Sequence, residues 1–274
     1  MNEAMRKPND FKSGVKPIWC PGCGDYGVLS ALTKAFARLN CAPEKIAVVS
    51  GIGCAARIPA YVNAYGLHGL HGRALPAAAG LKLARPELTV IAAGGDGDIY
   101  SIGGNHFIHA CRRNVDMTLI VMDNRIYGMT KGQPSPTTEP DYPTHLYPAG
   151  THVQPLDGMS LALVAGANFV ARAFTGDPND LAEIIVEAIR HPGFSVIEVL
   201  SPCVTFRPEE REWKHQIARH ALTPAGSVAE ALAAVASAPE LSTGIVWKGN
   251  RPPYTGPGDQ AGKRVQDVLD SFVA

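Results

Sequence analysis

Six cysteines have the clearest chemical potential in this chain, and four of them stand where a metal group can be bound. Cys20 and Cys23 form a Cys-x-x-Cys pair in WCPGCGDYG, which alone is half of a metal site or a disulfide candidate. Cys54 and Cys203 stand alone, each after an apolar run typical of a buried strand. Four thiolates can bind a [4Fe–4S] cluster, one for each iron, or a zinc ion. One pair with two isolated cysteines favours the cluster, because zinc sites typically combine two close pairs.

A second candidate site is the glycine–aspartate turn GGDGD at residues 94–98. The dipeptide DN begins 25 positions after Asp98, and its second residue is Asn124. Each motif follows an apolar run, so the carboxylate of Asp96 and the amide of Asn124 can reach one Mg²⁺, which prefers oxygen ligands shared with phosphates. The glycines allow the backbone to approach a diphosphate, and the N–H groups of the following helix, near residues 101–105, can bind it.

This spacing resembles the thiamine-diphosphate fingerprint, in which GDG is followed at a similar distance by an asparagine pair, here with an aspartate in the first place. The resemblance implies that Asp96 and Asn124 are Mg²⁺ ligands and that the carbonyl of Ile126 is a third. It also places Gly97 and Asp98 against the diphosphate. A dinucleotide site fits poorly, because GGDGDIYSIGG is not GxGxxG and no first βαβ unit precedes it.

The elements that must position these groups indicate an α/β fold. Continuous Val, Ile and Leu runs alternate with helical patterns, which predicts a mostly parallel sheet with helices on both faces. Function in such sheets collects at the carboxyl ends of the strands, where the cysteine and aspartate motifs lie. The expected strands are 45–54, 88–98, 116–124 and 194–203. The expected helices are 28–39, 75–84, 103–114 and 177–191, and a helix followed by a strand is expected within 154–173.

The pattern weakens after about residue 204, where proline, glycine and charge increase. We therefore expect residues 1–206 to form a domain that binds thiamine diphosphate and the cluster. Residues 207–274 are expected to form an irregular C-terminal extension that packs on the core or on a partner subunit.

Composition excludes several classes of function. The 274 residues are 46% hydrophobic and 18% charged, which suits a globular protein with a large core. The 25 basic residues balance 25 acidic ones, so no nucleic-acid partner is indicated. No apolar run is long enough to span a membrane, and MNEAMRKPNDFKSG lacks the apolar run of a signal peptide. These features predict a cytoplasmic protein, whose reduced cysteines bind metals more often than they form disulfides.

Jointly, seven motifs resemble the β subunit of 2-oxoacid:ferredoxin oxidoreductases, in order over about residues 15–210. The resemblance implies a subunit with thiamine diphosphate, Mg²⁺ and one [4Fe–4S] cluster, held by Cys20, Cys23, Cys54 and Cys203. It implies oxidative decarboxylation of a 2-oxoacid with coenzyme A, with electrons leaving singly through the cluster to ferredoxin. The same residues serve the reverse reductive carboxylation equally well. The motifs are WCPGCG, GIGC, HGLHGRALP, GGDGD, GGNHF, DNRIYGMTKGQPSPT and SPC.

The resemblance also implies active-site residues and partners. His71 is expected in the thiamine pocket, and Arg57 and Lys131 are candidates to bind substrate carboxylates. For His68 and Arg73, a cofactor contact and an ordinary structural role are equally open. The glutamate that activates thiamine lies on the α subunit in this family, so the chain alone is expected to be inactive and to work as αβ or (αβ)₂. The expected cofactor-binding residues are Gly53, Cys54, His71, Gly95, Asp96, Gly97, Asp98, Asn124, Ile126, Gly128 and Met129.

The substrate is less clearly indicated than the family. YGMTKGQPSPT favours 2-oxoglutarate, converted to succinyl-CoA and CO₂, because pyruvate-specific members tend to carry an asparagine–threonine–glycine turn there. A pyruvate-specific or broad-range enzyme stays an alternative. A thiamine decarboxylase or carboligase without a cluster would leave the four cysteines unexplained, and a zinc-binding interaction module would leave GGDGD and DN unexplained.

Overall fold

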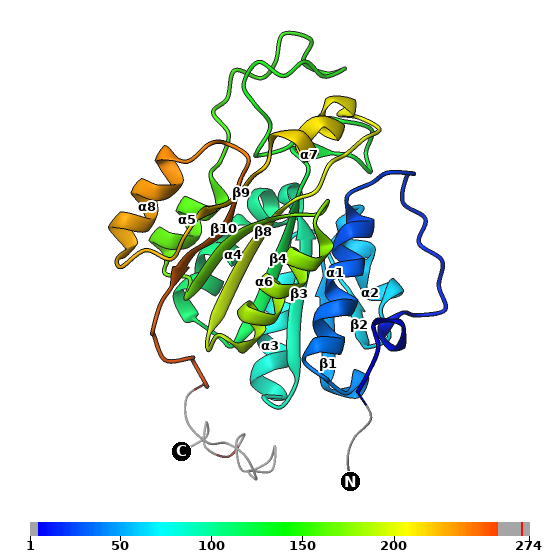
Figure 1. Ribbon diagram of the computed structural model, residues 1–274, viewed down its shortest axis with the longest axis vertical. Coiled ribbons are helices and arrows are strands. Elements are labelled where there is room, and N and C mark those ends of the chain that lie inside the picture. Colours follow the sequence, from blue (N-terminus) through cyan, green and yellow to red (C-terminus); the bar gives the residue numbers. More distant parts are fainter. Residues whose placement is uncertain (1–4, 257–269, 271–274) are drawn as a thin grey trace.

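The described part of the chain folds around one eight-stranded sheet. The computed structural model describes residues 5–256 and residue 270. The strand order is β2-β1-β3-β4-β8-β7-β10-β9, and Figure 1 shows this sheet in the middle of the molecule. The strands are β1 Ile46–Ser50, β2 Tyr65–His68, β3 Thr89–Gly95, β4 Met117–Asp123, β7 Phe169–Phe174, β8 Phe194–Leu200, β9 Ala218–Leu222 and β10 Ser242–Lys248.

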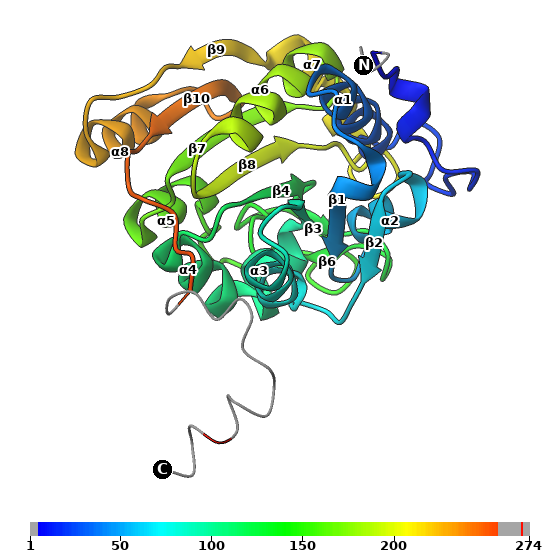
Figure 2. The same cartoon turned by 90° about the horizontal axis from the view of Figure 1, so that it is seen from below.

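The six strands from β2 to β7 run parallel. Their side chains alternate between two cores because successive residues of a strand point to opposite faces. Helices α1 and α6 cover one face, and α3, α4 and α5 cover the other (Figure 2). The prediction of a mostly parallel sheet with helices on both faces is confirmed. The helices are α1 Asp25–Arg38, α2 Ile58–Tyr61, α3 Ala74–Ala84, α4 Gly104–Arg113, α5 Gly158–Ala165, α6 Pro178–Arg190, α7 Trp213–Gln216 and α8 Val228–Ser237.

The segment after residue 206 is more regular than its composition indicates. It contains β9, α8 and β10, and β10 pairs antiparallel with β7 while β9 pairs with the outer edge of β10. This corrects the expectation of an irregular extension for residues 218–248. The domain boundary at residue 206 and a contact of this segment with a partner subunit stay predictions. Residues 257–269 and 271–274 of the expected extension lie outside the described residues.

Irregular segments gather at the carboxyl edge of the parallel strands. A short hairpin of β5 Ile126–Tyr127 and β6 Gln133–Pro134 follows β4, and a long connection leads from β6 to α5. In Figure 1 this connection and α7 lie above the upper edge of the sheet. Among the described residues, no helix is both long enough and apolar enough to cross a bilayer.

Candidate active site

One edge of the sheet collects the residues whose types suggest chemistry. Strands β1, β3, β4 and β8 are neighbours and run parallel, so their carboxyl ends lie side by side. Cys54, Asp96, Asn124 and Cys203 each follow one of these ends within four residues. The structure thus brings the expected ligands of both metal groups to the same edge.

Two buried carboxylates share one hydroxyl at this edge. The Oγ1 atom of Thr137 lies 2.8 Å from Oδ2 of Asp96 and 2.7 Å from Oδ1 of Asp123. Burial raises the pKa of Asp96, and burial together with the charge of Asp96 raises the pKa of Asp123 to about 6. A hydroxyl has only one proton to donate, so it cannot satisfy both carboxylates at once. A cation bound to Asp96 would offset this excess of negative charge, which fits the expected Mg²⁺.

The turn after β4 places the other two expected Mg²⁺ ligands beside Asp123. Oδ1 of Asn124 accepts a hydrogen bond from the N–H of Ile126 at 3.1 Å, and the N–H of Arg125 donates to Asp123 at 3.0 Å. Arg125 has a φ of 52°, a left-handed conformation that turns the chain back toward β6. A carboxylate, an amide oxygen and a carbonyl are the hard oxygen donors that Mg²⁺ takes. The donor set fits the ion, and its assignment as ligands stays a prediction.

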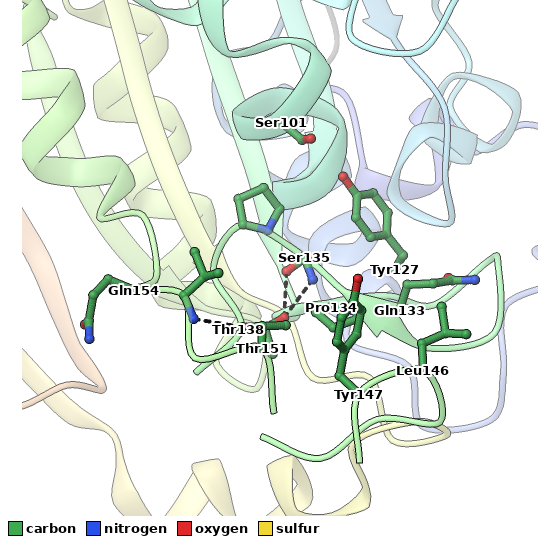
Figure 3. Close-up of a pocket in the computed structure, with 12 residues that line it drawn as sticks. Ser101, Tyr127, Gln133, Pro134, Ser135, Thr138, Leu146, Tyr147, Thr151 and Gln154 are labelled. Carbon is green, nitrogen blue, oxygen red and sulfur yellow. Dashed lines mark hydrogen bonds between the residues drawn. The ribbon is translucent and has the colours of Figure 1, made fainter. Parts of the chain in front are cut away.

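A pocket of about 500 Å³ opens beside this group (Figure 3). Its lining is uncharged and rich in hydroxyl and amide groups. The side chains of Ser101 and Tyr127 lie side by side in Figure 3, and the Tyr127 hydroxyl donates to the carbonyl of Gly97 at 3.1 Å. The pocket is lined by Ser101, Tyr127, Gln133, Pro134, Ser135, Pro136, Thr138, Leu146, Tyr147, Thr151, Val153 and Gln154.

The carboxylate of Asp98 connects its own loop with the loop after β1 and the loop after β2. Its Oδ1 atom accepts hydrogen bonds from the N–H of Gly72 at 2.7 Å and of Ile52 at 3.1 Å, and it lies 2.6 Å from Nδ1 of His71. Its Oδ2 atom has no hydrogen-bond partner in the described part of the chain. A Cβ on Gly51 would lie 2.0 Å from that oxygen, so only glycine fits there. These contacts favour a positioning role for Asp98, and its expected contact with a diphosphate stays a prediction.

The other expected polar side chains differ in where they lie. Nδ1 of His68 lies 3.0 Å from the hydroxyl of Ser50 and 2.9 Å from the carbonyl of Ala56, a local structural setting. Arg73 contacts His106 at 2.9 Å on the surface of the molecule. Neither side chain contacts the carboxylates of Asp96 and Asp123 or lines the pocket described above.

Arg57 and Lys131 lie at the carboxyl edge of the sheet. The positive charge of Arg57 acts on the thiol of Cys54 and opposes the rise of its pKa. Lys131 adopts a φ of 78° in the β5–β6 hairpin and lines a second pocket of about 440 Å³ together with Phe206. Their expected roles toward substrate stay predictions.

Hydrogen bonds join the three segments that carry Cys20, Cys23, Cys54 and Cys203. The N–H of Gly24 donates to the carbonyl of Pro202 at 3.1 Å, and Nε1 of Trp19 donates to the carbonyl of Cys54 at 2.8 Å. Burial raises the pKa of Cys23, the charge of Asp25 raises it further, and Cys54 and Cys203 add smaller contributions. Burial also raises the pKa of Cys54, to about 11, with contributions from Cys203 and Cys20. Three separate segments therefore bring four thiols together, as a shared binding site requires. Cys111, by contrast, is fully buried in the core, as expected for an ordinary small side chain.

Within the described residues, no three or more His, Cys, Asp or Glu side chains are placed to hold a single metal ion. The four thiols supply the number and type of donors that a four-iron cluster needs, and their assignment as ligands stays a prediction.

The loop that follows Ile126 lies against one of these thiols. A Cβ on Gly128 would be 3.4 Å from the Sγ atom of Cys203. Gly53, with a φ of 120°, precedes Cys54, and Met129 is half-exposed in the β5–β6 hairpin. The segment after β4 that carries Asn124, Ile126 and Gly128 (the expected cofactor loop) therefore lies beside the segment after β8 that carries Cys203 (the expected cluster loop).

The structure also shows site residues that sequence reasoning missed. Asp25 is buried beside Cys23 and accepts a hydrogen bond from the Ser201 hydroxyl at 3.0 Å, and burial raises its pKa to about 6. Thr137, between the two carboxylates, was missed in the same way. The motif GQPSPTT carries hydroxyls at close spacing, but only the folded loop shows which of them meets Asp96.

Comparisons with known proteins agree with this arrangement. A family described as thiamine pyrophosphate enzyme, C-terminal TPP binding domain, matches residues 51–199. The chain is 45% identical over 203 residues to 2-oxoacid:ferredoxin oxidoreductase 1, subunit beta, from Aeropyrum pernix, with 74% of this chain and 64% of that protein covered. It is 47% identical to 2-oxoglutarate oxidoreductase subunit KorB from Mycobacterium tuberculosis, over 73% of this chain and 54% of that protein. The chain thus spans less than two thirds of the length of these two relatives.

Two further relatives are covered more completely. The chain is 48% identical to 2-oxoglutarate synthase subunit KorB from Archaeoglobus fulgidus, over 69% of this chain and 70% of that protein. Its fold is similar to 2-oxoglutarate:ferredoxin oxidoreductase from Magnetococcus marinus, a structure with 2-oxoglutarate, coenzyme A and succinyl-CoA bound. That similarity has a TM-score of 0.89 and 38% identity, over 97% of this chain and 96% of the other.

Proposed function

Because the chain belongs to the family of 2-oxoacid:ferredoxin oxidoreductase β subunits, we propose that it is the thiamine-binding subunit of such an enzyme. The reaction takes a 2-oxoacid and coenzyme A to an acyl-CoA and CO₂, and two electrons pass to ferredoxin. We propose 2-oxoglutarate as the substrate and succinyl-CoA as the product. The names of three relatives, from Mycobacterium, Archaeoglobus and Magnetococcus, support this choice.

One observation carries the proposal: the expected cofactor loop touches the expected cluster loop. Gly128, two residues after Ile126, lies against Cys203, and Asp96 lies beside the turn of Asn124 on the same edge. A thiamine enzyme without a cluster has no use for four neighbouring thiols at this place. A cysteine-bound metal module has no use for buried carboxylates beside a pocket of about 500 Å³.

The proposed cofactors match the donors that the chain supplies. Thiamine diphosphate supplies a stabilised carbanion and the cluster accepts electrons one at a time. Asp96, Asn124 and the carbonyl of Ile126 would hold Mg²⁺, and the uncharged pocket beside them would take up the cofactor. The [4Fe–4S] cluster would be held by Cys20, Cys23, Cys54 and Cys203.

The remaining candidates would bind and orient the substrate. His71 is oriented by Asp98 through its Nδ1 atom, which leaves Nε2 as the ring nitrogen for a ligand. Arg57, beside Cys54, and Lys131, in the β5–β6 hairpin, are candidates to pair with the two carboxylates of 2-oxoglutarate. A second carboxylate-binding cation would discriminate 2-oxoglutarate from pyruvate, which has only one carboxylate.

The proposed partners follow from the same family. An α subunit would supply the glutamate that activates thiamine, so we propose that the β chain alone is inactive and works in an αβ or (αβ)₂ assembly in the cytoplasm. The extension from residue 207 is proposed to contribute to that assembly. Ferredoxin would accept the electrons.

The activity is tested on the chain co-produced with its α partner and purified without oxygen. Ferredoxin should be reduced only when 2-oxoglutarate and coenzyme A are both present, and the β chain alone should reduce none. Activity of the β chain alone would contradict the proposed division of the active site. Comparable kcat/KM values for pyruvate and 2-oxoglutarate would contradict the proposed substrate.

Replacing Thr137 by valine tests the role of the shared hydroxyl. The change keeps the volume but removes the hydrogen bond that orients Asp96, so the affinity for Mg²⁺ and thiamine diphosphate should fall by about 10-fold or more. Titration calorimetry on the αβ complex would measure this loss. Thr137→Ser keeps a hydroxyl and should restore most of the affinity. Equal affinities of the valine variant and the unchanged protein would show that the hydroxyl does not orient the ligand.

A further inference from the structure

A buried arginine joins the loop after β8 to the turn after β4. Arg207 is 4% exposed, and its guanidinium forms ion pairs with three carboxylates at 2.8–3.2 Å. Only a planar group with several fixed N–H donors can serve so many acceptors at once, which distinguishes arginine from lysine. The three partners are Glu139, Glu209 and Glu210.

On one side, the segment 207–210 holds the backbone of Cys203, and the Arg207 guanidinium reaches this cysteine through Glu210. Glu210 is 1% exposed, and its Oε2 atom accepts a hydrogen bond from the N–H of Cys203 at 2.8 Å. Its Oε1 atom lies 3.1 Å from Nε of Arg207, an ion-pair distance without hydrogen-bond geometry. The backbone N–H of Arg207 donates to the carbonyl of Cys203 at 2.8 Å. Both polar backbone groups of the cysteine are therefore fixed by residues 207–210.

On the other side, the same guanidinium holds the turn that carries the expected Mg²⁺ ligands. Nη1 of Arg207 donates to the carbonyl of Arg125 at 3.4 Å, and Nη2 donates to Glu139 at 3.0 Å. Glu139 in turn accepts from Arg125 at 2.6 Å. Arg125 stands between Asn124 and Ile126, so its position sets the position of both.

We infer that Arg207, with Glu139 and Glu210, is a positioning residue that holds the cluster loop and the cofactor loop in one fixed arrangement. The inference rests on the proposed function of the two loops. Buried ion networks often add little net stability, because desolvation offsets their attraction. A role in fixing the geometry explains why this network lies between the two loops. In the proposed reaction, electrons would pass from one of these loops to the other.

The test uses the αβ complex and two measurements that do not depend on turnover. The first is the affinity for Mg²⁺ and thiamine diphosphate, and the second is the EPR spectrum of the reduced cluster. Arg207→Gln should weaken cofactor affinity by about 10-fold or more and change the g values or line width of the cluster signal. Arg207→Lys keeps the charge but not the fork, and it should recover only part of each effect.

Two further variants complete the design. Glu139→Gln breaks the bridge between the two arginines at a half-exposed position, so it tests the same coupling if Arg207→Gln fails to fold. Arg219→Gln serves as the control. It removes an exposed arginine of β9 whose guanidinium pairs with Asp177 at 2.6 Å. The control should leave both measurements unchanged.

The outcomes separate this inference from the proposed function. If the folded Arg207 or Glu139 variants match the Arg219 control, or if only one of the two measurements changes, the inferred coupling is wrong. If the unchanged complex binds neither thiamine diphosphate nor iron, the proposed function fails, and the inference fails with it.

Discussion

Asp96→Asn is expected to abolish measurable binding of Mg²⁺ and thiamine diphosphate, with an affinity loss of at least about 100-fold. The substitution keeps the shape of the side chain but removes the negative charge that the ion needs. Loss of a ligand should cost more than loss of a group that only orients a ligand, such as Thr137. The αβ complex should keep its cluster signal, because the cysteines are untouched.

In the complex without cofactor, the same substitution is not expected to lower the unfolding temperature. Asp96 and Asp123 are buried and share one hydroxyl, so removal of one charge relieves their mutual repulsion. The variant should therefore unfold at the same temperature as the unchanged protein or at a higher one. Addition of Mg²⁺ and thiamine diphosphate at about 100 times the Kd of the unchanged protein should stabilise that protein by about 2.7 kcal/mol and the variant by about 0.4 kcal/mol or less.

A matched control lies at the start of the neighbouring strand β4. Asp116 precedes β4 at the opposite edge of the sheet, where it pairs with Lys82 at 3.1 Å. Asp116→Asn should leave cofactor binding unchanged. Cofactor-dependent stabilisation of Asp96→Asn equal to that of the control would show that Asp96 is not a ligand.

Cys203→Ser is expected to remove the cluster signal and to lower the rate of ferredoxin reduction by about 100-fold or more. A serine hydroxyl is a poor substitute for a thiolate at iron, and one of the four irons would lose its protein ligand. Cofactor binding should change much less, because Asp96, Asn124 and Ile126 remain. Iron content, EPR and ferredoxin reduction on the αβ complex measure these effects.

Cys41→Ser provides the control for this change. Cys41 follows the C-terminal end of α1, beside Thr89 at the start of β3, whereas Cys23 precedes the other end of this helix. Its substitution should leave iron content and activity within the error of the unchanged protein. Full iron content and activity in Cys203→Ser would contradict the assignment of this cysteine. Equal iron loss in both variants would indicate a general effect of cysteine loss rather than loss of a ligand.

Much of the fold could be predicted because its central strands are uniformly buried. All residues of β1, β4 and β8 are buried, and such apolar runs are visible in the sequence without any tertiary information. β9 and β10 could not be predicted in this way. β9 is mostly exposed and carries Arg219 and His220, and β10 joins the sheet antiparallel next to β7, a pairing that depends on the folded chain.

The candidate site could be predicted only where residue type is itself informative. Cysteines at strand ends and an aspartate between glycines are rare enough to indicate chemistry, and the structure brings Asp96 and Asn124 to one edge. The roles of Ser101, Tyr127 and Thr137 could not be predicted, because hydroxyl residues are common in any sequence. The position of Thr137 also depends on how the long loop after β6 folds back onto Asp96. Glu210 was hidden for a similar reason, since its contact with Cys203 is made by a surface-like sequence, RPEERE.

The central claim is that four cysteines and a thiamine site share one edge of the sheet. It is tested most directly by iron and acid-labile sulfide analysis with EPR, on the αβ complex purified without oxygen. We expect about four irons and four sulfides per β chain and an EPR signal that appears on reduction. Zinc without sulfide would contradict the claim and would leave, at most, a thiamine enzyme with a structural metal.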